Sequence, residues 1–348
     1  MTAIGTGLAA ELREAPDAVR RQADAIAPAL AALMARLARR PPALVVSCAR
    51  GSSAHAATFA KHLIERYLGI PVAEAAPNIA SVYRRGLRLK DQLFLAISQS
   101  GASDDLVETA AMARTAGALT AALVNEECSP LAAACDIVLP MAAGTEHNVA
   151  ATKSFISSLA ALLRIVAQWT DDAVLRRGCD RLPERLAGAA KLDWSAALRP
   201  LAGATSLIAI GRGPTLAIAR EAALKLKETC ALPAEAFSSA EFRHGPIALV
   251  SPAHPIMVFA PTDESRAGLL ELVADLGRKS ACVLLAQPEH AQHHIPRVVA
   301  LPAPIAEQAE ADAICLIQSF YAFLVGLAKR RGTDIDAPPH LQKVTRTR

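Results

Sequence analysis

The feature that most constrains the fold is an internal repeat with a constant offset of 162 residues. Four short apolar runs of the first half return in the second without a gap: 45–51 at 207–213, 94–97 at 256–259, 122–125 at 284–287 and 139–140 at 301–302. Apolar runs of this length, bounded by turn residues and separated by helical segments, are typical of buried parallel strands. The repeat therefore predicts an α/β fold with two tandem domains, each a doubly wound parallel sheet flanked by helices.

The domain boundaries follow from the repeat and its flanks. Before the first copy, apolar residues recur at helical spacing, and Pro41 ends that pattern. We predict a helical segment at 1–40, a first domain at 41–170, a connector at 171–198, a second domain at 199–330 and a C-terminal tail at 331–348.

Composition limits the class of protein. Hydrophobic residues make up 52% of the 348, and the net charge of +4 has no basic block behind it, so no nucleic-acid partner is expected. Seven scattered cysteines without a C-x-x-C pair are typical of reduced thiols in the cytosol. No signal peptide is visible, and Phe155–Trp169, which we take as the most apolar segment, is too short to span a bilayer. We expect a cytoplasmic protein without a membrane partner.

The strongest site signal is the stretch from Leu93 to Ser103, where an apolar strand runs into hydroxyls, an amide and a glycine. A helix is predicted at 106–116, directly after this turn. Gly101 allows close backbone approach, the serines offer hydroxyl donors, and the helix N-terminus adds a partial positive charge, so the turn suits an anion. The alternative is a serine-rich turn in which Ser103 only caps the helix.

A second polar turn, Arg50-Gly51-Ser52-Ser53, follows the strand predicted at 43–48 and precedes a helix predicted at 54–67. The carboxyl ends of parallel strands line one crevice, so we expect both turns to bind one phosphorylated ligand. In the second copy the turn at 98–101 becomes 260–263, which contains Pro261 and Asp263. Proline removes a donor and aspartate repels anions, so the second domain is expected to serve another purpose.

Three weaker signals lie further along the chain. Lys225 and Glu228 share a helix face, which usually indicates a solvated ion pair. His244 precedes a Gly-Pro turn and is either a surface residue or free to project into a site. The tail at 334–345 is either frayed or anchored by Leu341 and Val344, which would place Lys343 in a pocket that lowers its pKa toward amine chemistry.

A histidine cluster in the second domain invites a metal interpretation. It consists of His290, His293 and His294 in a predicted loop, with no supporting ligand beyond Glu289. Zinc sites need three or four ligands at suitable spacing, so we predict neither a metal nor any other cofactor.

Five motifs in order resemble the isomerase half of glucosamine-6-phosphate synthase, which consists of two sugar isomerase (SIS) domains. The resemblance covers about 40–348 and is carried by 98–101, 143–153, 223–228, 243–246 and 334–343. It implies that the sugar phosphate is bound by Ser52, Ser53, Ser98, Gln99, Ser100 and Ser103, with Val149 and Ala151 lining the sugar.

The same resemblance implies the catalytic roles. Glu228 would shuttle a proton between C1 and C2, and Lys225 would stabilise charge on the carbonyl oxygen. Lys343 would form the Schiff base with the open-chain ketose. His244 would open the sugar ring in the site of the neighbouring subunit, which implies a homodimer.

Two departures from the family's pattern matter. The synthase carries a glutaminase domain with a cysteine after the initiator methionine, whereas here residue 2 is Thr and no cysteine precedes Cys48. Glutamine is therefore not expected to supply the nitrogen. The family's first turn reads Cys-Gly-Thr-Ser, so Arg50 in this chain either adds charge near the phosphate or faces solvent.

Stand-alone proteins with two SIS domains and these motifs resemble the synthase-like glucosamine-6-phosphate deaminases. The expected reaction converts glucosamine 6-phosphate and water to fructose 6-phosphate and ammonia. The alternatives are a fructosamine 6-phosphate deglycase, a galactosamine-6-phosphate deaminase/isomerase, and a non-catalytic phosphosugar sensor of the kind found in transcription regulators. No helix-turn-helix fits before residue 41, and a sensor has no need of the four catalytic residues together.

Overall fold

The computed structural model describes residues 6–279, 281–288, 295 and 298–343. Its contacts divide the chain into two compact units. We call N-unit the one formed by 17–146, 153–179 and 342–348, and C-unit the one formed by 1–16, 147–152 and 180–341. The first helix, α1 (Thr6–Arg39), lies where the N-terminal helical segment is predicted, and it contributes residues to both units.

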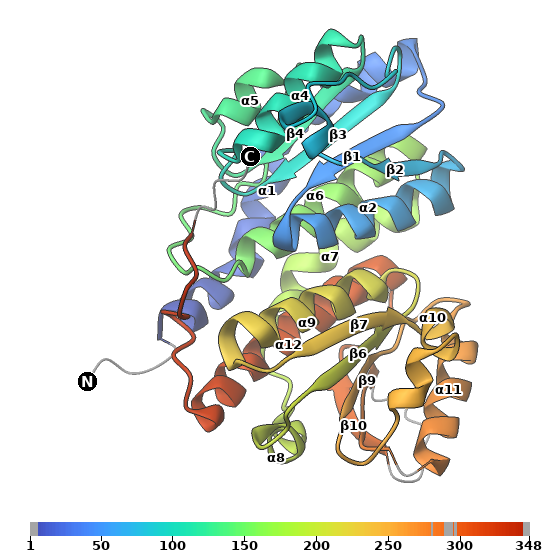
Figure 1. Ribbon diagram of the computed structural model, residues 1–348. Helices are drawn as coiled ribbons and strands as arrows, with labels where there is room; N and C mark the ends of the chain where they lie inside the picture. The colour runs from blue at the N-terminus through green and yellow to red at the C-terminus, as the bar shows by residue number, and fades with distance from the viewer. Residues whose placement is uncertain (1–5, 280, 289–294, 296–297, 344–348) are drawn as a thin grey trace. The chain divides into compact units, whose positions relative to one another are not determined.

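The N-unit contains a sheet of five parallel strands in the order β2-β1-β3-β4-β5. These strands are β1 (Val45–Ala49), β2 (Val72–Glu74), β3 (Leu93–Ser98), β4 (Leu119–Val124) and β5 (Ile137–Pro140). One face of the sheet is covered by α2 (Gly51–Leu68) and α6 (Lys153–Thr170), and the other by α4 (Asp104–Thr115) and α5 (Pro130–Ala134) (Figure 1). The unit also contains the short α3 (Asn78–Ser81).

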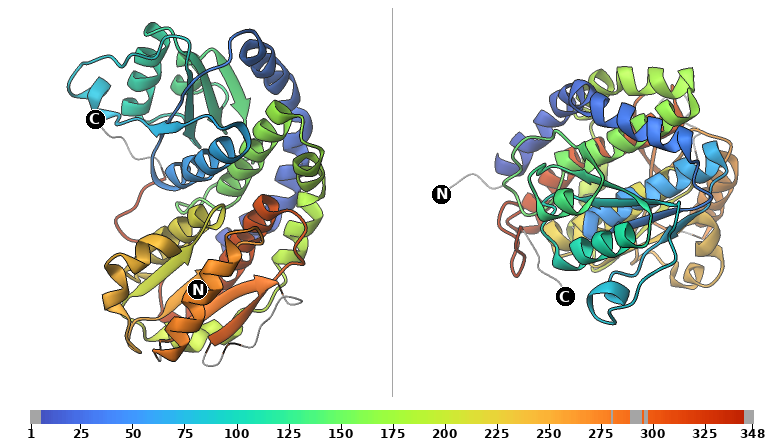
Figure 2. Two further views of the ribbon diagram at one scale, coloured as in Figure 1. Left: turned by 90° about the vertical axis from the view of Figure 1, so that its right-hand side faces the viewer. Right: turned by 90° about the horizontal axis from the view of Figure 1, so that it is seen from above.

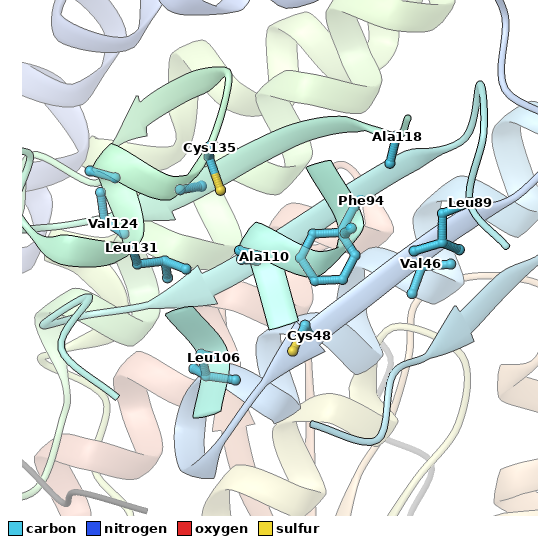
Figure 3. Packing of buried hydrophobic residues seen from close by; sticks show 14 residues of the cluster. Val46, Cys48, Leu89, Phe94, Leu106, Ala110, Ala118, Val124, Leu131 and Cys135 are labelled. Carbon is cyan, nitrogen blue, oxygen red and sulfur yellow. The ribbon is translucent and has the colours of Figure 1, made fainter. Parts of the chain in front are cut away.

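Small side chains allow α4 and α5 to pack closely on this sheet. The buried cluster joins Phe94 of β3 and Val124 of β4 to Leu106 of α4 and Leu131 of α5 (Figure 3). Cys48 lies in the same cluster, and burial, followed by the charge of Asp105, raises the pKa of its thiol to about 12. All seven cysteines are free, and five of them are buried.

The C-unit repeats this architecture with the strand order β10-β9-β8-β6-β7. Its parallel strands are β6 (Leu207–Gly211), β7 (Ala234–Ser238), β8 (Ile256–Phe259), β9 (Val283–Pro288) and β10 (Val298–Ala303). On one face α9 (Thr215–Cys230) and α12 (Ala309–Arg331) lie side by side (Figures 1 and 2). On the other, α10 (Ser239–Arg243) and α11 (Arg266–Arg278) pack against the strands through an apolar cluster.

The remaining elements connect or extend these layers. Helix α7 (Ala173–Ala189) contributes residues to both units. The other elements are the short helices η1 (Ser195–Ala197), α8 (Leu198–Ala202) and η2 (Pro246–Leu249). Every strand of the N-unit sheet has its counterpart in the C-unit sheet at the offset of 162 residues, and both sheets have equivalent strand orders. The predicted fold of two equivalent doubly wound domains is therefore confirmed.

One expectation about apolar segments is wrong. Among the described helices, α12 rather than the segment Phe155–Trp169 is long and apolar enough to cross a membrane by length and composition. However, 83% of its most apolar window is buried within the protein. Its apolar character is thus explained by its place in the core of the C-unit, beside α9.

Candidate functional site

The strand order of the N-unit places a topological switch point between β1 and β3. The connection after β1 leads toward β2 and that after β3 toward β4, so the chain leaves these neighbouring strands in opposite directions. Ligands of open α/β sheets bind outside the carboxyl ends of the strands at such a point. The two polar turns that the sequence singled out, at 50–53 and 98–103, are the two that follow β1 and β3.

The turn after β1 differs from the prediction in one respect. Helix α2 begins at Gly51, three residues earlier than expected, so Ser52 and Ser53 lie in its first turn. The first backbone N–H groups of a helix have no intrahelical partner, which strengthens the case for an anion at this position.

The turn after β3 is held by its own serines. Ser98 Oγ accepts a hydrogen bond from Gly101 N at 3.1 Å, and Ser100 Oγ accepts one from Ala102 N at 3.3 Å. Ser103 occupies the N-cap position of α4, but its side chain makes no capping hydrogen bond. The alternative in which Ser103 only caps the helix therefore explains where the residue lies, but its hydroxyl group does not make the hydrogen bond that a cap would make. Gln99 is half-buried in the same turn.

We expect that Gly101→Ala disrupts this turn. Gly101 has φ +58°, and a Cβ there would lie 2.1 Å from Ser129 Oγ and 2.5 Å from Ser129 Cβ. Left-handed backbone strain and this overlap should together lower the free energy of unfolding by about 3 kcal/mol. Binding of a sugar phosphate should weaken roughly tenfold or more, because the turn must move.

The matched control is Gly69→Ala, at the C-terminal end of α2. Gly69 also has a positive φ, but no atom lies within 4 Å of a Cβ built there. The Gly69→Ala substitution should lower the free energy of unfolding by only about 1 kcal/mol, through backbone strain. Urea unfolding and isothermal titration with a sugar phosphate give both quantities, and equal effects of the two substitutions would contradict the packing argument.

Arg50 has a role that neither sequence alternative anticipated. Its Nη2 and Nε lie 2.7 Å and 3.1 Å from Asp105 Oδ2. Asp105 is buried in the first turn of α4, whereas the Arg50 side chain is half exposed. The pair therefore connects the two polar turns across the switch point, and it compensates a negative charge that would otherwise oppose an anionic ligand.

In the C-unit, Lys225 is not the solvated residue that its spacing suggested. Its side chain is 1% exposed, and Nζ lies 2.5 Å from Glu228 Oε2 and 3.4 Å from Glu221 Oε1. Burial alone lowers the pKa of Lys225, but the charges of Glu221 and Glu228 outweigh it, and the pKa is raised. The helix thus holds a charged ammonium group away from bulk water, beside a carboxylate that is 21% exposed.

Sequence reasoning missed Glu221. Its side chain is fully buried and accepts a hydrogen bond from Tyr321 Oη of α12 at 3.0 Å. The signal was present, because Glu221 lies four residues before Lys225 and so shares its helix face. What the sequence did not reveal is that this face is the one packed against α12.

A cavity of about 490 Å³ opens beside Glu228 in the C-unit. Its lining consists of Lys227, Glu228, Thr229, Ala231, Gly332, Thr333, Asp334, Ala337, Pro339 and Leu341. The segment after α12 is held against it, since Thr333 Oγ1 donates to Thr229 O at 2.7 Å. Glu228, the carboxylate with partial access to solvent, therefore faces a space large enough for a small ligand.

The tail is anchored differently from the prediction. Leu341 is 41% exposed and anchors nothing, whereas Ile335 is fully buried. Asp336 accepts backbone hydrogen bonds from Gly7 and Leu8, which fastens the tail to the start of α1. Val344, the second predicted anchor, lies outside the described residues.

Lys343 is half-buried and its Nζ lies 3.0 Å from Glu146 Oε2, a contact within the N-unit. Glu146 is itself buried and also accepts hydrogen bonds from Ser154 N and Oγ at the start of α6. Lys343 therefore has a specific carboxylate partner, which the sequence did not identify. Val149 and Ala151 are half-buried in the segment 147–152, which belongs to the C-unit.

His244 lies directly after α10, exposed to solvent, in front of Gly245 with φ +132°. The structure therefore leaves its predicted role untested. The histidines His290, His293 and His294 lie outside the described residues. Within the described part of the chain, no cluster of three or more His, Cys, Asp or Glu side chains could hold a metal ion.

The structure thus groups the predicted site residues into two sets. The serines, Gln99 and Lys343 belong to the N-unit, and the Lys225–Glu228 pair, His244, Val149 and Ala151 belong to the C-unit. The first set offers hydroxyl and N–H donors at a switch point, which suits a phosphate group. The second offers a buried cation beside an accessible carboxylate, which suits proton transfer next to a developing negative charge.

Comparison with known proteins agrees with these features. The SIS domain model matches residues 44–167 and 200–291. The glutamine–fructose-6-phosphate aminotransferase (isomerizing) of Symbiobacterium thermophilum is 33% identical over 318 residues, which cover 86% of this chain and 50% of that protein. The chain therefore spans about half the length of this relative.

Two solved structures illustrate the likeness in fold. A protein of Silicibacter pomeroyi described as a candidate phosphosugar isomerase superposes with a TM-score of 0.90 at 40% identity, covering 95% of this chain and 100% of its own. The glucosamine-6-phosphate deaminase of Thermotoga maritima has the same fold, with a TM-score of 0.72 at 21% identity, covering 96% and 100%. The SIS domain model matches both halves of the repeat, and the Symbiobacterium aminotransferase is 33% identical over 86% of this chain. This chain therefore belongs to the SIS domain family.

Proposed function

We propose that this protein is a glucosamine-6-phosphate deaminase, which converts glucosamine 6-phosphate and water to fructose 6-phosphate and ammonia. The observation that carries the proposal is the buried Glu221–Lys225–Glu228 arrangement on α9, because binding alone does not need it. The hydroxyl-rich turns of the other SIS segment support a phosphorylated ligand. We further propose the domain boundaries 41–170 and 199–330, within which both matched segments lie.

The chemistry follows from these groups. In the open-chain aldose, Glu228 removes the C2 proton and the electrons move toward the C1 carbonyl oxygen, where the ammonium group of Lys225 stabilises the negative charge. The oxyanion takes up a proton and becomes a hydroxyl, the amine at C2 loses a proton, and Glu228 returns a proton to C1. These transfers complete the aldose-to-ketose shift and leave an imine at C2. The amine of Lys343 then adds to C2 and displaces ammonia, and water hydrolyses the resulting Schiff base to fructose 6-phosphate, which regenerates Lys343. These reaction steps need no external oxidant, reductant or cofactor.

The test is ammonia release from glucosamine 6-phosphate, with fructose 6-phosphate measured in parallel. Equal amounts of both products are expected. No ammonia, together with thermal stabilisation by the same sugar phosphate, would contradict the deaminase. Fructosamine 6-phosphate and galactosamine 6-phosphate would then be tested in the same assay, and binding of all three without turnover would favour a phosphosugar sensor.

We expect Lys343→Ala to abolish ketose formation without unfolding either unit. The residue is half-buried and contributes one ion pair with Glu146, so its removal leaves the two apolar cores intact. Borohydride reduction in the presence of fructose 6-phosphate should trap the open-chain sugar on Lys343 of the wild type and leave the variant unlabelled. Trapping on another lysine would contradict the assignment.

We also propose a homodimer in the cytoplasm in which His244 serves the site of the neighbouring subunit. His244 is exposed in the single chain. A residue that reaches the site of a partner subunit must be exposed before the subunits associate. Inactive His244→Ala and Glu228→Gln subunits, mixed and refolded together, should regain part of the wild-type activity, because each dimer would contain one complete site. The expected recovery is roughly a quarter of wild-type activity if subunits mix at random. Purified heterodimers without activity would argue against a shared site.

A further inference from the structure

The C-unit contains a turn equivalent to the hydroxyl-rich turn that follows β3 in the N-unit. The offset of 162 residues aligns β8 with β3, and it places Thr262 on Ser100 and Ser265 on Ser103. Ser103 and Ser265 occupy the N-cap positions of α4 and α11, so the two turns are also equivalent in structure. β6 and β8 are neighbours in the sheet, as β1 and β3 are, so this turn also lies at a switch point.

In the C-unit this position is already occupied by a side chain of the same unit. Thr262 Oγ1 donates a hydrogen bond to Asp312 Oδ2 at 2.5 Å. Arg185 Nη2 of α7 donates to Asp312 Oδ1 at 2.5 Å, and the backbone N–H groups of Glu307 and Gln308 lie 3.2 Å and 3.4 Å from the same oxygen. Asp312 is 5% exposed, so its carboxylate is almost completely enclosed by these donors.

This set of donors is one that binds anions. A guanidinium, a hydroxyl and two main-chain N–H groups converge on one carboxylate, as they do around a bound phosphate. Local helix capping explains the N–H groups of Glu307 and Gln308, which directly precede α12. It does not explain Arg185 and Thr262, which lie 127 and 50 residues away in the sequence.

The donors also exceed what the carboxylate uses. Arg185 is 8% exposed, and its Nη1 is buried without a hydrogen-bond partner. A buried donor without a partner is unfavourable, and an oxyanion with more acceptor oxygens than a carboxylate would satisfy it. The donors around Asp312 therefore offer at least one more hydrogen bond than its carboxylate accepts.

We propose that Asp312 is a built-in occupant of an anion-binding crevice in the second SIS segment, and that removing its carboxylate opens this crevice to inorganic phosphate. In the wild type the turn after β8 and the start of α12 are then held together without any ligand. The first residue of α9 is also fastened to the end of β8, because Thr215 Oγ1 donates a hydrogen bond to Phe259 O at 2.7 Å. The inference depends on the repeat and on the contacts of Asp312, and it holds whatever reaction the protein performs.

The test compares thermal unfolding of the wild type and of Asp312→Ser in phosphate and in chloride at equal ionic strength. The variant should be less stable than the wild type in chloride, because Arg185 loses its charged partner. Phosphate should restore stability: at ten times its Kd, the ratio of folded to unfolded protein should rise about tenfold beyond any change in the wild type. The wild type accounts for general salt effects and for phosphate bound in the N-unit.

Two control variants separate a binding site from a mere structural ion pair. Glu307→Gln removes a neighbouring carboxylate that lies 3.8 Å from Arg185 Nε, and it should create no extra response to phosphate. Adding Arg185→Gln to Asp312→Ser should abolish the response, because the main donor is gone. An Asp312→Ser protein that folds and responds to phosphate as the wild type does would overturn the proposal.

A poorly folding variant still gives an answer. Refolding of Asp312→Ser from urea should then yield more native protein in phosphate than in chloride, with the yield measured by size-exclusion chromatography. Equal yields in the two buffers would also overturn the proposal.

Discussion

Glu228→Gln is expected to bind glucosamine 6-phosphate nearly as well as the wild type and to lose about 1,000-fold in kcat, within the range attributed to a general base. Glutamine preserves the shape of the side chain, and its carbonyl oxygen can still accept a hydrogen bond from Lys225 Nζ, 2.5 Å from the carboxylate in the wild type. The substitution removes the base and keeps the packing. KM should therefore change by no more than a few fold.

The measurement is steady-state ammonia release, with binding followed separately by isothermal titration. Glu235→Gln is the control, because Glu235 is an exposed glutamate of β7 in the same unit. It should leave kcat and KM unchanged. Activity of Glu228→Gln within tenfold of the wild type would remove Glu228 from the role of base.

Lys225→Met is expected to have the largest effect on stability. It leaves Glu221 and Glu228 without the buried cation that lies between them, at 3.4 Å and 2.5 Å. Removing one partner of a buried ion pair costs about 3–5 kcal/mol, because the remaining charge stays in the interior without compensation. Activity should be lost as well, since no cation remains to stabilise the developing oxyanion.

Urea unfolding measures this loss, and Lys227→Met is the matched control. Lys227 lies two residues away on the same helix and is exposed, so its substitution should change the free energy of unfolding by less than about 0.5 kcal/mol. If Lys225→Met and Lys227→Met have the same free energy of unfolding, the buried ion pairs do not contribute to the stability of the protein, and the prediction is wrong.

The raised pKa of Lys225 also predicts the pH dependence. Folding favours the protonated form, so its contribution is fully present below the ordinary lysine pKa of 10.5 and is lost as pH rises through the higher folded value. The wild type should therefore lose stability in strongly alkaline solution, in a step that Lys225→Met lacks. Neutral and mildly acidic solutions should not affect this contribution.

Much of the fold was predictable because parallel strands are buried on both faces. β1, β3 and β6 consist almost entirely of apolar residues, with Ser47 and Ser98 as exceptions, and every residue of these strands is buried. The repeat then placed equivalent strands in equivalent order, since a constant offset leaves little freedom in topology. The polar turn after β3 was found for the same reason, because its polar residues interrupt an apolar run abruptly.

The site was less predictable wherever a side chain depends on a partner distant in sequence. The spacing of Lys225 and Glu228 was visible, but their burial depends on α12, whose Tyr321 is 100 residues from Glu221. Arg50 was left with two alternatives because its partner Asp105 lies 55 residues away. The sequence left open whether the tail is frayed or anchored through Leu341 and Val344, and the structure buries Ile335 while Leu341 is 41% exposed.

The sequence by itself determined the repeated architecture, the switch-point turns and the family, because these rest on local hydrophobic pattern and on short motifs. Only the tertiary structure decided the charge environment: how deeply Lys225 is buried, which carboxylate faces a cavity, and which donors surround Asp312. Hydrophobic burial acts on each segment through its own composition, whereas the energy of a charge depends on where the other charges and the solvent lie. That arrangement exists only once the segments have packed.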